Sequence, residues 1–148
     1  MNRKSLLPAV TLAALVAASC WFGMYRGSFA AKQARFQNVA DQIEKGTLPA
    51  NRFGIVTLAP RWAALTADGN VYVTNGPGNQ KVELFCTWRG KGSDLWGYLH
   101  STSPLTVPST LRISIPFPSN TSPAVVSDVQ IRSLAAPGWY WVSGRNDG

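Results

Sequence analysis

The sequence predicts a mainly β protein with one N-terminal transmembrane helix, a following amphipathic helix, and a small β-sandwich or open-barrel head of about six to seven strands. Two observations predict this fold. An apolar stretch without charged residues runs from Leu6 to Tyr25, and at about 1.5 Å per residue it would form a helix of roughly 30 Å, the thickness of a bilayer core. From Phe53 onward the apolar residues change from helical spacing to alternation, which is typical of strands.

We expect four segments in this chain of 148 residues. They are a basic N-terminus at 1–5, a membrane anchor at 6–25, a connecting amphipathic helix at 26–46 and a globular head at 47–148. The part that follows the anchor is long enough for one domain with a single hydrophobic core.

Three interpretations of the N-terminus remain open, and each gives a different mature protein. Arg3 and Lys4 precede a long apolar run, which favours an uncleaved signal anchor because the core of a cleavable signal is usually shorter. A lipoprotein signal would instead use Cys20, which follows small residues, and ordinary signal cleavage would follow Ala30. A short basic N-terminus usually stays inside, so we expect the head on the extracytoplasmic side, periplasmic or extracellular.

The first element after the anchor is a helix predicted over Ala30 to Lys45. Its apolar residues recur at helical spacing, namely Phe36, Val39, Ala40 and Ile43. Gly46 provides a natural stop, because glycine readily adopts the left-handed conformation that ends many helices. We expect the narrow apolar stripe of this helix to pack on the sheet that follows.

Short apolar runs separated by turn formers predict the strands of the head. These runs are Phe53–Leu58, Val71–Thr74, Lys81–Trp88, Leu95–Ser101, Leu111–Ile115, Val125–Leu134 and Trp139–Ser143, with a helical turn at Pro60–Leu65. The turn formers at 75–79 join the second and third runs into a hairpin.

Alternation within the strands assigns side chains to faces. In the run that ends at Trp88, we expect the core face to carry Val82, Leu84, Cys86 and Trp88. The run Leu95–Ser101 has large residues on both faces, which indicates a central strand covered on both sides.

Catalytic and metal-binding chemistry has little support in the sequence. The chain has one histidine, His100, and two cysteines, of which Cys86 alone lies in the head, so neither a site with several histidines nor a thiolate cluster can form. A small cysteine on an apolar strand is more typical of a core than of a nucleophile, and no two carboxylates have the spacing of an acid–base pair. We therefore predict no enzymatic activity, no metal and no cofactor.

Two segments have features of a binding site. In the loop after Arg89, Lys91 lies between two glycines whose backbone amides could face a phosphate or a headgroup, although a solvated hairpin loop has the same composition. Trp96 and the pair Trp139 and Trp141 could stack on sugar rings, although tryptophans also fill small cores. The net charge of +7 favours anionic partners, but few basic residues flank the aromatic ones, so nucleic acid is not expected.

These patterns predict a non-enzymatic, single-pass membrane protein whose β-rich head is an accessory or interaction module of a larger membrane or envelope assembly. Its expected partners are the lipid bilayer and other membrane protein subunits. Small and hydroxyl residues would let the span pack closely on other helices, namely Thr11, Ala14, Ala18 and Ser19. The alternative prediction is a membrane-tethered domain that binds a glycan or an anionic ligand.

Overall fold

The computed structural model describes residues 29–89, 94–107, 109–115 and 125–144. The chain divides into two units, Met1–Phe36 and Gln37–Gly148, and each is described by itself. Helical residues run from 29 to 44 and so belong to both units. In the first unit, the rings of Phe29 and Phe36 stack with centroids 5.8 Å apart.

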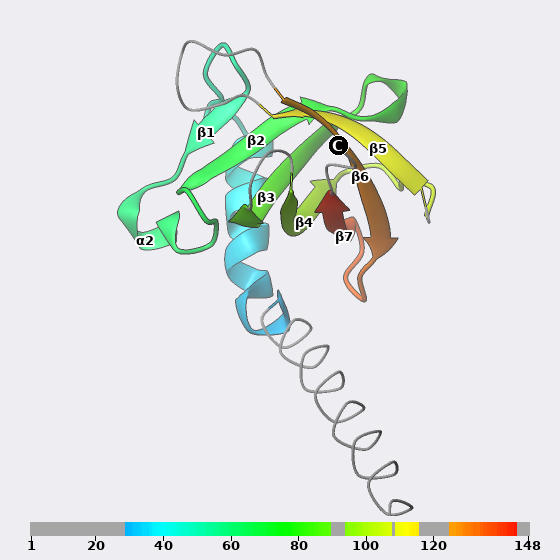
Figure 1. Ribbon diagram of the computed structural model, residues 1–148. Coiled ribbons are helices and arrows are strands. Elements are labelled where there is room, and N and C mark those ends of the chain that lie inside the picture. Colours follow the sequence, from blue (N-terminus) through cyan, green and yellow to red (C-terminus); the bar gives the residue numbers. More distant parts are fainter. Residues whose placement is uncertain (1–28, 90–93, 108, 116–124, 145–148) are drawn as a thin grey trace, which may run out of the picture. The chain divides into compact units, whose positions relative to one another are not determined.

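The second unit contains one curled sheet of seven strands in the order β1-β2-β3-β4-β7-β6-β5, and all neighbouring strands are antiparallel. The strands are β1 Ile55–Thr57, β2 Asn70–Asn75, β3 Lys81–Arg89, β4 Leu95–Ser101, β5 Ser109–Ile115, β6 Val125–Ser133 and β7 Trp139–Gly144. Helix α2 spans Pro60–Ala63, and a 3-10 turn spans Pro77–Asn79. The sheet forms a half-barrel in which β5 approaches β2 (Figure 1). The described strands therefore make an open barrel and not a two-sheet sandwich.

The hydrophobic core lies on one face of this sheet, which we call the inner face. Antiparallel pairing brings alternate side chains of six strands together on it. The buried members are Tyr72, Val82, Leu84, Cys86, Leu95, Leu99, Leu111, Val129, Ile131, Tyr140 and Val142, joined by Leu105 from the loop that follows β4. The N–H of Leu105 donates to the hydroxyl of Tyr140 at 2.8 Å, which ties this loop to the core.

The opposite face, which we call the outer face, is covered in part by the helical residues 37–44. The indole Nε1–H of Trp139 donates to Oε1 of Gln37 at 2.7 Å, and Glu44 lies 3.4 Å from Nδ1 of His100. Val39 and Ala40 are fully buried. The prediction that the apolar stripe of the helix packs on the sheet is therefore confirmed for these residues.

The predicted elements agree with the structure to within a few residues. The predicted helix 30–45 corresponds to helical residues 29–44, and Gly46 has φ +72°, the conformation predicted for a stop. The hairpin is confirmed by the pairing of β2 with β3. Strand β4 lies between β3 and β7, as expected for a central strand.

The prediction that Trp88 shares the core face with Cys86 is wrong. A register shift lies between these two residues, so that Cys86 opposes Gly97 while Trp88 opposes Trp96. The extra residue of this β-bulge, Thr87, reverses the alternation and turns Trp88 to the outer face.

Among the described residues, no helix is both long and apolar enough to cross a membrane. The predicted anchor at 6–25, with Thr11, Ala14, Ala18 and Ser19, lies outside the described residues.

Candidate functional site

The outer face carries aromatic and polar side chains in rows that the strand register defines. One row is Glu83, His100 and Trp139; the next is Phe85, Tyr98, Trp141 and Arg132; the third is Trp88, Trp96, Ser143 and Gln130. The first row lies under the helical residues 37–44. The third row contains the most exposed aromatic side chain of the sheet.

Trp88 and Trp96 form a stacked pair on this third row. Their ring centroids lie 4.6 Å apart and their planes differ by 25°. Trp88 keeps 41% of its surface exposed, whereas most large apolar side chains of the described chain are buried. A stacked pair on a sheet surface is rigid, because the packing of the two rings limits both side chains.

The β-bulge that presents Trp88 is held by local contacts. The hydroxyl of Thr87 donates to the carbonyl oxygen of Trp96 at 3.2 Å, and the thiol of Cys86 donates to the carbonyl oxygen of Trp88 at 3.1 Å. Gly97 lies opposite the bulge, where an added Cβ would stand 2.2 Å from the carbonyl oxygen of Phe85. Only glycine permits this close approach of β3 to β4.

A second aromatic contact continues the surface toward β7. Trp141 is half-buried and meets the buried Tyr98 edge-on, with centroids 5.6 Å apart. Trp141 lies opposite Tyr98 and is therefore a diagonal neighbour of Trp96, a separation that large aromatic side chains can bridge. We call Trp88, Trp96 and Trp141 the aromatic surface.

No protein-family model, curated protein or solved structure matches this chain.

The structure brings together two of the predicted ligand-binding residues, Trp96 and Trp141, on one face. Trp139 is also on that face, but it is 1% exposed and hydrogen-bonded to Gln37, so it packs and offers no surface to a ligand. Arg89 ends β3, and Lys91 lies outside the described residues.

Sequence reasoning missed Trp88 as a surface residue. Regular alternation places it in the core, and nothing in the run of β3 itself marks the bulge. The available signal was Gly97 on the neighbouring strand, since a glycine within a strand often indicates a bulge or a close backbone approach.

A polar cluster occupies the first row, beneath the helix. Nδ1 of His100 lies 3.1 Å from Oε2 of Glu83 and 3.4 Å from Oε1 of Glu44. Burial raises the pKa of Glu83 above its ordinary value of 4.5. His100 opposes this increase by hydrogen bonding and by its charge, whereas the charges of Glu44 and Asp41 add to it.

Cys86 and His100 do not form a nucleophile–base pair. Cys86 belongs to the core of the inner face, whereas His100 contacts Glu83 on the outer face. The sheet itself therefore separates the thiol from the imidazole.

Proposed function

We propose that the protein is a non-enzymatic, single-pass membrane protein that acts as an accessory subunit of a larger membrane or envelope assembly. Residues 6–25 anchor it in the bilayer, and the head binds another protein subunit on the extracytoplasmic side. The observation that carries this proposal is the exposed, stacked pair of Trp88 and Trp96 on the outer face.

The energetics of protein interfaces support this role for the aromatic surface. Tryptophan is among the residues that contribute most to binding at interfaces, because it buries a large area with few rotatable bonds. Trp88 has a rigid backing in Trp96 and a bulge that holds it outward. Burial of such a side chain by a partner costs little conformational entropy, since the free protein already orders it.

The test is purification of the full-length tagged protein from its native membrane in mild detergent, followed by mass spectrometry of what co-purifies. We expect other membrane proteins to co-purify with the wild-type protein in stoichiometric amounts. Trp88→Ala should weaken the association by about 2 kcal/mol or more, which is roughly a thirtyfold change in Kd.

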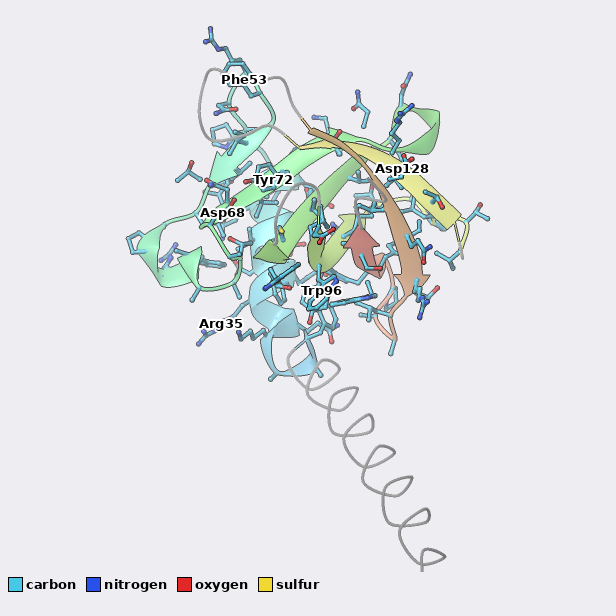
Figure 2. The ribbon with its side chains drawn as sticks, in the orientation of Figure 1. Arg35, Phe53, Asp68, Tyr72, Trp96 and Asp128 are labelled. Carbon is cyan, nitrogen blue, oxygen red and sulfur yellow. The ribbon has the colours of Figure 1, made fainter. Side chains whose placement is uncertain are left out.

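Phe53→Ala is the matched control for Trp88→Ala. Phe53 is the other large apolar side chain that is clearly exposed in the described chain, at 48%. It lies apart from Trp96 on the head (Figure 2), so its truncation should leave the partner bound. A wild-type protein that purifies alone would refute the accessory role, and equal loss of partner in both variants would refute the assignment to the aromatic surface.

The exposed indole of Trp88 also favours a second candidate function, a membrane-tethered glycan-binding domain. Sugar rings stack on exposed indoles, and the same row continues with the polar residues Ser143 and Gln130, which could bond to sugar hydroxyls. In this case the wild-type protein, purified without partners, should bind isolated cell-envelope polysaccharide in a sedimentation assay. Trp88→Ala should abolish that binding, and absence of binding by the wild type would exclude this candidate.

A further inference from the structure

Acidic side chains gather at one point of an otherwise basic protein. The chain has 14 basic and seven acidic residues. Two of the acids, Glu44 and Glu83, lie beside its single histidine, and a third, Asp41, is near enough for its charge to act on Glu83. Among the described residues, no lysine or arginine forms a salt bridge with these three. The cluster therefore holds more negative charge than the surrounding protein compensates.

The place of the cluster in the fold increases this excess. Glu44 is the last helical residue, so its carboxylate lies at the C-terminus of a helix, where the exposed carbonyl groups already carry partial negative charge. Glu83 is buried, with 5% of its surface exposed. Its Oε2 pairs with Nδ1 of His100 at 3.1 Å. A cation bound at Oε2 would offset the negative charge of the neighbouring carboxylates.

The donor atoms converge in the manner of a coordination shell. Nδ1 of His100 lies 3.1 Å from Oε2 of Glu83 and 3.4 Å from Oε1 of Glu44. The donor atoms of the three residues all lie within 4.8 Å of one another. Ligands at about 2.0 to 2.2 Å from a metal stand about 3 to 3.5 Å apart in octahedral or tetrahedral geometry. The side chains therefore need little movement to bind an ion.

We propose that Glu44, Glu83 and His100 bind one divalent transition-metal ion. An imidazole nitrogen with two carboxylates suits zinc or manganese, whereas magnesium and calcium prefer ligand sets made only of oxygen. Three protein ligands leave further positions for water on the side of Glu44, whose side chain is 36% exposed. Because Glu44 comes from the helix and the other ligands come from β3 and β4, the ion fastens the helix to the sheet.

The experiment uses the full-length protein in mild detergent with a tag that contains no histidine. The metal content of protein from the native membrane is measured first; the protein is then stripped with a chelator and titrated with ZnCl2 and with MnCl2 by calorimetry. We expect one bound ion per chain for at least one of the two metals. We also expect a rise in melting temperature on binding, and weaker binding as the pH falls, because the ligands must lose protons.

Glu44→Gln is the decisive variant, since an exposed side chain can be replaced without loss of the fold. It should weaken metal binding at least tenfold. Asp128→Asn is the matched control, because Asp128 is an acidic residue 66% exposed on β6, away from the cluster, and it should leave binding unchanged. Failure of the wild type to bind either metal would overturn the proposal, as would Glu44→Gln binding as tightly as the wild type.

Discussion

Replacing Trp88 by alanine tests the β-bulge, on which the aromatic surface depends. Burial of a large apolar side chain stabilises a protein by up to about 3 kcal/mol. Because Trp88 keeps 41% of its surface exposed, its burial contributes about three fifths of that free energy. No cavity forms at the surface, because water fills the space. Trp88→Ala should therefore lower the free energy of unfolding by about 1 to 2 kcal/mol.

Trp139→Ala provides the comparison within the same sheet. Trp139 is 1% exposed and hydrogen-bonded to Gln37, so its truncation removes a hydrogen bond and leaves a cavity. We expect a loss of about 3 to 5 kcal/mol. At about 4 °C per kcal/mol for a domain of this size, the melting temperature should fall by about 4 to 8 °C in Trp88→Ala and by at least about 12 °C in Trp139→Ala, measured by near-UV circular dichroism in detergent.

The two possible registers of β3 predict different results. In a strand without the bulge, Trp88 would join Val82, Leu84 and Cys86 in the core, and its truncation would cost as much as that of Trp139. Equal destabilisation by the two variants would therefore refute the bulge and, with it, the aromatic surface. If Trp88→Ala lowers the free energy of unfolding only slightly, the head stays folded. Failure of this variant to co-purify with a partner then reflects the loss of contacts at the aromatic surface.

Three further variants test contacts between the strands and between the helix and the sheet. Gly97→Ala should destabilise the head by about 1 to 3 kcal/mol or more, because its Cβ would stand 2.2 Å from the carbonyl oxygen of Phe85; an unchanged melting temperature would mean that β3 and β4 lie farther apart. Gln37→Leu removes the acceptor of the Trp139 indole and should cost about 1 kcal/mol, and a double-mutant cycle with Trp139→Phe should show a coupling of similar size. Because burial raises the pKa of Glu83, the folded state holds this proton more tightly than the unfolded state, so stability is greatest below the ordinary pKa and declines as the pH rises through the raised value. Glu83→Gln should remove this decline in melts from about pH 4 to pH 8 with chelator present, and an identical pH profile in the variant would contradict it.

Local patterns were sufficient to predict most of the secondary structure. The helix follows from apolar residues at helical spacing and from Gly46, whose φ of +72° ends it. The hairpin of β2 and β3 follows from the dense turn formers between them. Each of these signals depends on neighbours in the sequence, and such elements are determined largely by local preference.

The sites depend on contacts that local patterns do not contain. Glu44, Glu83 and His100 are far apart in the sequence, and no spacing typical of a metal site links them. They meet because β3 and β4 pair with Glu83 opposite His100 and because the helix ends above this pair. Prediction of this cluster requires the register of the sheet and the position of the helix together.

The bulge connects the failed prediction with the proposed function. A regular β3 would bury Trp88 in the core, where its large area would stabilise the fold. The chain instead gives up part of that stabilisation, places Gly97 where most residues would clash, and exposes an indole to water. Departures from the regular pattern that reduce stability are expected where a protein binds or acts. The aromatic surface is therefore a better candidate for a partner-binding site than the loop at Arg89.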